Sequence, residues 1–270
     1  MLPKLQYYHL GEGVKAFSST RRGGYSEGNY GEFNINRYCG DSEKSICKNR
    51  ALLCQLLQID DDQLLMPHQV HQTKIMTVDR TFLRLSALER QQQLEGVDAL
   101  MTDVPGICIG VSTADCIPVL LFDKVHRVSC AIHAGWRGTV KRIVEKAVMA
   151  MTSVYGSRPS DIVAQIGPGI HLESFEVGDE VYDAFASEGF QMETISRRFP
   201  QKWHIDLPLC NRQQLLASGI PANQIFVSPV CTYQHSDTYF SARRLGINSG
   251  RIFTGILNCL VEKTDVVSEV

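Results

Sequence analysis

Short runs of apolar, mostly β-branched residues lie in the middle of the chain. They occupy residues 107–111, 119–122, 128–132 and 162–166, and polar segments separate them. Runs of this length and composition predict buried strands. In the segment from Thr73 to Val78, the residues Thr73, Ile75 and Thr77 alternate with Lys74, Met76 and Val78. This alternation predicts a further strand, with His68 and His71 at its entrance.

Helical spacing of apolar residues follows in other segments. Residues 42–58 predict a helix with Asp41 or Ser42 as its cap. A second helix, capped by Thr139, is predicted by an apolar stripe at helical spacing. The stripe consists of Val140, Ile143, Val144, Ala147, Val148 and Met151. Two more helices are expected near residues 178–185 and 209–217. Strands interleaved with few helices predict an α/β or α+β sandwich, and the uniform composition predicts a single domain over residues 1–270.

Composition narrows the class of protein. The 270 residues include 27 Lys plus Arg against 29 Asp plus Glu, a net charge of -2. This balance argues against a nucleic-acid binder held by a general basic surface. We see no signal peptide and no apolar stretch long enough to span a bilayer, so we expect a soluble protein that binds neither membrane nor nucleic acid. Nine widely spaced cysteines suggest reduced thiols and a cytoplasmic location. The charge says nothing about the oligomeric state.

Polar residues concentrate in three segments at the ends of apolar strands: 67–72, 111–118 and 132–139. Because a sheet can gather side chains from separate strand ends, His71, Cys116 and His133 could form one metal site. Two imidazoles and a thiolate suit zinc and leave a fourth position open for catalysis. A lone cysteine is also typical of a small buried residue, and no Cys-x-x-Cys pair is present, so spacing alone leaves both interpretations open.

The segment from Gly135 to Gly138 precedes the predicted amphipathic helix. Free backbone N–H groups there, with Arg137 beside them, would suit a phosphate group. A plain strand-to-helix turn explains the same residues, and by itself the pattern favours the turn.

Several ordered motifs together resemble one known family over nearly the whole chain. They are STRRGGYS at 19–26 with Asn34, HQVH at 68–71, VDALMTDVPGICIGVSTADCIPVLLFD with AIHAGWRGTV, IGPGI and FEVG within 166–178, IDLPLCNRQQLLASGI at 205–220, and VCTYQHSDTYFSARRLGINSGR at 230–251. The family is that of the YfiH-like or laccase-domain proteins, once labelled multicopper polyphenol oxidases. In one departure, Ala242 stands where an aromatic residue is frequent, which would alter the pocket wall.

The resemblance implies a fold and an activity. The fold is an α/β sandwich grouped with cytotoxic necrotizing factor-like catalytic domains and cysteine hydrolases. The implied activity is that of a zinc-dependent purine nucleoside phosphorylase, which also acts as adenosine deaminase and methylthioadenosine phosphorylase. Purine nucleosides and phosphate would be its partners, and His71, Cys116 and His133 would be its metal ligands. Some bacterial members are implicated in peptidoglycan editing.

Chemistry suggests roles for further residues. Phosphorolysis needs an anion cradle, for which we consider Arg21, Asn34, Arg137, Arg243 and Arg244, with Arg137 as the first choice. Deamination needs an activated water and a proton carrier, for which we consider Asp115.

Three other interpretations stay open. Cys116 could be the nucleophile of a cysteine hydrolase with His133 as its base. A copper polyphenol oxidase is disfavoured, because several coppers need many imidazoles and the chain has eight histidines, of which only His68 and His71 are closely spaced. The site could also stabilise a binding module without enzyme activity.

Overall fold

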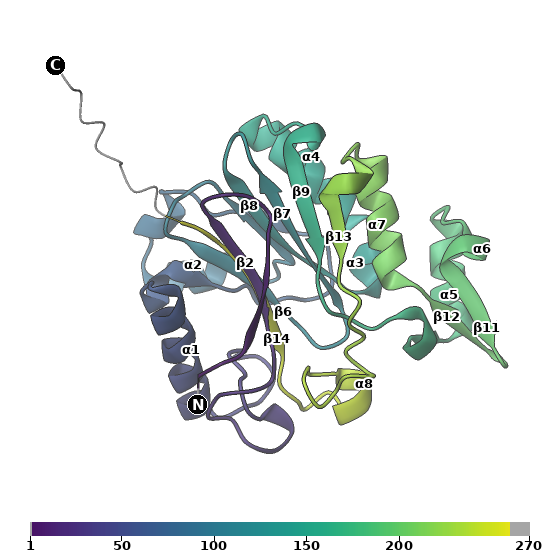
Figure 1. Cartoon of the computed structure of the whole chain (residues 1–270), viewed down its shortest axis with the longest axis horizontal. Coiled ribbons are helices and arrows are strands. Elements are labelled where there is room, and N and C mark those ends of the chain that lie inside the picture. The colour runs from purple at the N-terminus through teal and green to yellow at the C-terminus, as the bar shows by residue number, and fades with distance from the viewer. Residues whose placement is uncertain (1, 260–270) are drawn as a thin grey trace.

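The computed structural model describes residues 2–259. The single domain expected over residues 1–270 therefore includes residues that lie outside the described ones. The described part consists of three sheets, eight α-helices and six short 3₁₀ helices, a mixed α/β architecture as expected (Figure 1).

The largest sheet has six strands in the order β13 (Ile225–Val227), β9 (Ile162–Ile166), β7 (Ile117–Asp123), β8 (Val128–Ala134), β5 (Ala99–Thr102) and β4 (Ile75–Thr77). A five-stranded sheet has the order β1 (Leu5–Tyr8), β2 (Val14–Ser19), β14 (Ile252–Asn258), β6 (Cys108–Thr113) and β3 (Leu64–Leu65). A small third sheet has the order β10 (Glu176–Val177), β12 (Lys202–Ile205) and β11 (Ser196–Phe199).

The two larger sheets pack face to face, and helices cover their outer faces. In β7, Leu120 and Phe122 face the five-stranded sheet, whereas Val119 and Leu121 face α4 (Ile143–Tyr155) and α7 (Leu207–Ala217). Because both faces are buried, the strand reads as a continuous apolar run. On the other side, α1 (Glu43–Leu57) packs on the five-stranded sheet through Leu53. The result is a helix–sheet–sheet–helix sandwich (Figure 1).

The remaining helices surround this sandwich. The small sheet, α5 (Asp179–Ser187) and α6 (Met192–Ile195) form a lobe at one side (Figure 1). The other helices are α2 (Ala87–Gln93), α3 (Trp136–Val140) and α8 (Ala242–Leu245).

Most of the predicted elements are confirmed within a few residues, and one helix is corrected. The predicted cap Thr139 lies inside α3, which begins after Gly135, and α4 starts separately at Ile143. Arg142 separates the two helices in the left-handed conformation, with φ of 58°. Its guanidinium donates hydrogen bonds to Glu145 and to the carbonyl oxygen of Glu188, which hold the chain at this break.

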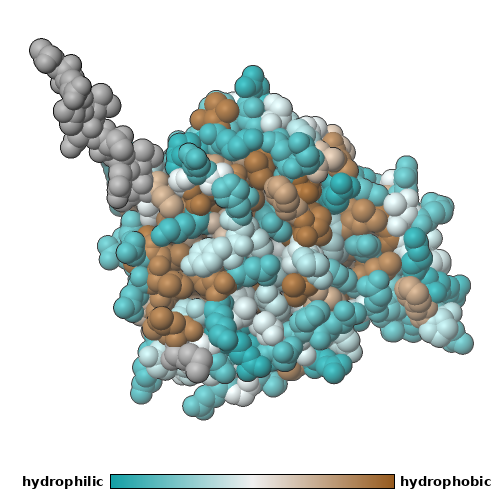
Figure 2. Space-filling model, viewed as in Figure 1, coloured by the Kyte–Doolittle hydropathy of each residue, from teal (hydrophilic) through white to brown (hydrophobic). Residues whose placement is uncertain are grey.

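The described residues contain no helix that is both long and apolar enough to cross a membrane. Figure 2 shows a surface on which polar side chains predominate, with apolar ones gathered in several places, one of them near β13. Phe226 and Val227 of that edge strand are exposed.

Candidate metal centre and substrate cavity

Four strand ends meet at one edge of the six-stranded sheet. Cys116 directly precedes β7, and His133 lies near the end of the antiparallel strand β8, where it pairs with Pro118. Asp98 directly precedes β5, and its carbonyl oxygen accepts a hydrogen bond from the backbone N–H of His133 at 2.8 Å. His71 lies in the loop before β4. Strand pairing therefore brings distant parts of the sequence to one place.

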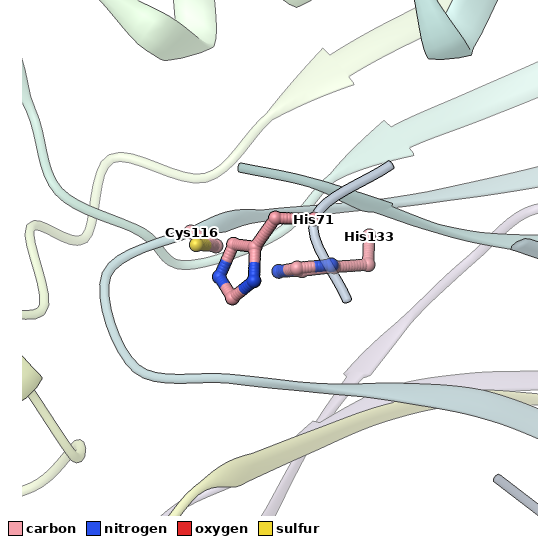
Figure 3. A group of neighbouring side chains, drawn as sticks. All are labelled: His71, Cys116 and His133. Carbon is pink, nitrogen blue, oxygen red and sulfur yellow. The ribbon is translucent and has the colours of Figure 1, made fainter. Parts of the chain in front are cut away.

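His71, Cys116 and His133 form a close group. Their candidate ligand atoms all lie within 4.8 Å of one another, and the three side chains point toward a common space (Figure 3). The two imidazole rings meet edge to face, with centroids 4.8 Å apart. His133 is 2% exposed, whereas His71 is open to solvent. The metal group inferred from the sequence is thus brought together by the fold.

Asp98 orients this group, and the sequence interpretation missed it. Its buried carboxylate lies 2.7 Å from Nδ1 of His133 and accepts backbone hydrogen bonds from His71 and Gln72 at 3.0 and 2.8 Å. Because a carboxylate only accepts here, Nδ1 carries the proton and Nε2 is left for a metal. A carboxylate at the start of the apolar segment Val97–Met101 was the available signal.

Gly135 leaves room beside the donors. A Cβ atom at this position would lie 3.0 Å from Sγ of Cys116 and 3.0 Å from Cδ2 of His71. Glycine in the turn from β8 into α3 therefore avoids a crowded contact with two of the three donors.

The charges in the group are coupled. Burial opposes ionisation of Cys116, but the neighbouring His133 and His71 outweigh it and lower the pKa of the thiol to about 6. Burial likewise opposes protonation of His133, but Cys116 and Asp98 outweigh it and raise its pKa to about 9. The site thus favours a thiolate, the form in which cysteine binds metals.

A cavity of about 650 Å³ opens over the three donors. Aromatic side chains line it, among them Tyr38, His68, Trp136 and Phe175, and two arginines, Arg243 and Arg251, reach its wall. Cavities of this size and mixed lining are typical of sites for small molecules.

Some of the residues proposed for phosphate binding and proton transfer line the cavity, and the others do not. Arg243 and Asp115 line the cavity. Arg21, Arg137 and Arg244 are not among its lining residues. Arg21 donates to the carbonyl oxygens of Gly31 and Ser236, and Arg244 donates to the hydroxyl of Tyr233. The guanidinium of Arg137 lies over the ring of Trp136, 4.1 Å from its centroid.

Asn34 acts behind the cavity wall instead of on it. Its Oδ1 accepts hydrogen bonds from the backbone N–H groups of Asn36 and Arg251, both of which line the cavity. Arg251 was missed in the sequence because it lies beyond the paired arginines, at the start of the segment leading into β14. Ala242 lines the cavity, so the departure at this position does fall on the pocket wall.

Comparison with known proteins identifies the family. Residues 15–258 match the model of the multi-copper polyphenol oxidoreductase laccase family. The chain belongs to this family.

Relatives in the family carry enzyme names. A Bacteroides thetaiotaomicron protein named purine nucleoside phosphorylase is 48% identical, with 90% of this chain and 91% of the relative covered. A protein named adenosine deaminase RL5, from an unknown prokaryotic organism, is 44% identical, with 94% and 98% covered. The crystal structure of YlmD from Geobacillus stearothermophilus superposes with a TM-score of 0.86 at 30% identity, with 92% and 93% covered. The resemblance and the α/β fold class are both confirmed.

Proposed function

We propose that this protein is a zinc-dependent purine nucleoside phosphorylase that also deaminates adenosine and phosphorolyses methylthioadenosine. The observation that carries the proposal is the opening of the three-donor group into a cavity with aromatic and cationic walls. The names of the relatives from Bacteroides and the unknown prokaryote support the two reaction types.

The three donors fit zinc. One thiolate and two imidazoles match catalytic zinc sites with an open fourth position, and ligand atoms in such sites lie about 3.5 Å apart. Small side-chain movements would close the present group around an ion. Asp98 supplies the carboxylate that zinc-bound histidines commonly require, and Gly135 keeps the neighbouring space free. Zinc bound by His71, Cys116 and His133 would supply Lewis acidity at this end of the cavity.

Arg243 is our candidate for the phosphate site. One of its side-chain N–H groups donates to the carbonyl oxygen of Glu176 at 3.0 Å, and guanidinium has further donors for an anion. Its backbone N–H donates to Asp115 Oδ2 at 2.7 Å, which fixes the start of α8 at the cavity. Phosphate held there would be placed for attack on the ribose C1′ carbon.

Asp115 is held on both oxygens. Oδ1 accepts from the hydroxyl of Thr232 and Oδ2 from the backbone of Arg243, both at 2.7 Å. These hydrogen bonds indicate that Asp115 helps to position Arg243. The role of Asp115 as the acid/base of deamination stays a prediction.

The aromatic walls suit a purine. Trp136 and Phe175 line the cavity, and aromatic rings of this kind can stack on a purine. The nine cysteines are all free, which supports the proposed reducing, cytoplasmic location. We also propose that residues 1–270 form one catalytic domain.

Purified, zinc-loaded protein tests the proposal. With inosine and phosphate it should release hypoxanthine and ribose 1-phosphate, and with adenosine in the absence of phosphate it should form inosine. Methylthioadenosine with phosphate should release adenine. Chromatography of the products measures all three reactions. If zinc-loaded protein forms no product from any of them, the proposed function is wrong.

A cysteine hydrolase is the second candidate, because Cys116, His133 and Asp98 have the order of a nucleophile, a base and an orienting carboxylate. Covalent trapping of Cys116 in zinc-loaded protein without loss of zinc would favour it. For a multicopper oxidase, the described residues 2–259 offer one group of three donors, which suits one ion.

A further inference from the structure

A second carboxylate–imidazole pair lies on the cavity wall, outside the metal group. Nδ1 of His68 is 2.6 Å from Oε1 of Glu95, and His68 lines the cavity. The arrangement repeats that of His133 with Asp98. The difference is exposure: the side chain of His133 is 3% exposed and that of His68 is 35% exposed. A half-exposed imidazole can exchange its proton with water.

His68 is held from three directions. Its backbone forms a β-bridge with Glu95, in which its N–H donates to Leu94 and its carbonyl accepts from Gly96. The ring of Tyr38 stacks on its imidazole, with centroids 4.1 Å apart and planes 20° from parallel. With Nδ1 on Glu95, only Nε2 remains, and the structure gives it no hydrogen-bond partner within residues 2–259.

Such fixing is what a proton donor requires. A carboxylate that accepts from Nδ1–H fixes the ring orientation and leaves Nε2 as the ring nitrogen that can pass a proton to the cavity. Protonation of the purine ring at N7 turns the departing base into a neutral leaving group. Cys116 and Arg243 cannot take this role, because the thiolate accepts and guanidinium does not release its protons, and His71 and His133 are committed to the metal group.

We propose that His68 donates the proton to the departing purine and that Glu95 positions it, an inference that rests on the phosphorolysis proposed above. A phosphate oxygen forms a bond to C1′ while the C1′–N9 bond breaks, and the electron pair of the C1′–N9 bond passes into the purine ring. The proton leaves Nε2 of His68 for N7 of the purine. Hydrogen phosphate loses its own proton on forming ribose 1-phosphate, and that proton restores His68 through solvent.

Two substrates separate this role from a structural one. Inosine needs a proton at N7 to leave, whereas 7-methylguanosine carries a methyl group and positive charge there and needs none. His68→Gln should lower kcat for inosine phosphorolysis about 100-fold. The same variant should keep kcat for 7-methylguanosine within about threefold of the parent, because the proton is not required. Its zinc content should stay that of the parent.

Glu95→Gln is the second variant. It keeps a hydrogen-bonding side chain but loses the charge, so kcat for inosine should fall about tenfold while KM stays unchanged. The matched control is His126→Gln. His126 also pairs through Nδ1 with a carboxylate, that of Asp123 at 2.9 Å, and is 40% exposed, but it does not line the cavity. This control should leave kcat for inosine and for 7-methylguanosine unchanged.

The outcomes distinguish the two proposals. If the parent protein phosphorolyses no nucleoside, the proposed phosphorolysis is wrong, and the proton-donor role that rests on it is overturned as well. If the parent is active and His68→Gln lowers kcat for inosine and for 7-methylguanosine equally, or lowers neither, the proton-donor role is overturned while the proposed function stands. Should His68→Gln fail to fold, Glu95→Gln decides: a loss confined to inosine supports the role, and an equal loss on both substrates overturns it.

Discussion

Replacement of Asp98 by Asn tests how far zinc binding depends on the orienting carboxylate. The buried side chain accepts from Nδ1 of His133 and from the backbone of His71 and Gln72. An amide offers one accepting oxygen, and its NH₂ group would face an N–H group. At least one hydrogen bond is lost, and the charge that stabilises His133 is removed.

The magnitude follows from these contacts. Loss of a carboxylate behind a zinc-bound histidine lowers metal affinity about 10- to 100-fold, which corresponds to about 1.4–2.7 kcal/mol. Competition of the protein with a chromophoric chelator measures the zinc dissociation constant. The free energy of unfolding of the metal-free protein should also fall, by about 1–3 kcal/mol, because the buried N–H groups lose a charged partner.

Asp123→Asn provides the control. Asp123 is equally buried, accepts backbone hydrogen bonds from Val125 and His126, and contacts the ring of His126, all away from the cavity. This variant should lower stability but leave zinc affinity unchanged. The reasoning is refuted if the zinc dissociation constant of Asp98→Asn stays within about twofold of that of the parent. It is also refuted if Asp123→Asn weakens zinc binding as much as Asp98→Asn does.

Three further predictions concern the same cavity. Gly135→Ala should fold but bind zinc at least about tenfold more weakly, since the new methyl group would crowd Cys116 and His71; metal analysis after dialysis would show it, and full zinc occupancy would contradict it. In metal-free protein, iodoacetamide should modify Cys116 even near pH 6.5, because the lowered pKa of about 6 keeps the thiolate populated above that pH and lost below it, and zinc should protect it; mass spectrometry locates the label, and modification confined to pH above 8 would count against a lowered pKa. Arg243→Ala should raise the KM for phosphate about tenfold or more without slowing adenosine deamination, as steady-state kinetics would reveal; an equal effect on both reactions would remove Arg243 from the phosphate site.

Local pattern was sufficient for most of the secondary structure. The runs that became β6, β7, β8 and β9 are buried on both faces, so their apolar character is continuous and readable from the sequence. The break between α3 and α4 was not readable. Arg142 is in the left-handed conformation there, and its guanidinium donates to Glu145 and to Glu188, the second of which lies far along the chain.

The candidate ligands could also be named from the chain. Histidine and cysteine at strand ends suited a metal but left a buried cysteine open as an alternative, and the resemblance of several motifs to one family favoured the metal. The family and the α/β class followed from those residues. Residue type and order were enough for that step.

The surroundings of the ligands were decided only by the tertiary structure. Asp98 reaches His133 because β5 pairs with β8, and Glu95 reaches His68 through a bridge formed by two loops. Of the four arginines proposed for phosphate, only Arg243 reaches the cavity, and Arg251 joins it from the segment leading into β14. Chemical type can be read from a sequence, but which charges share a cavity depends on long-range strand pairing, whose partners are far apart along the chain.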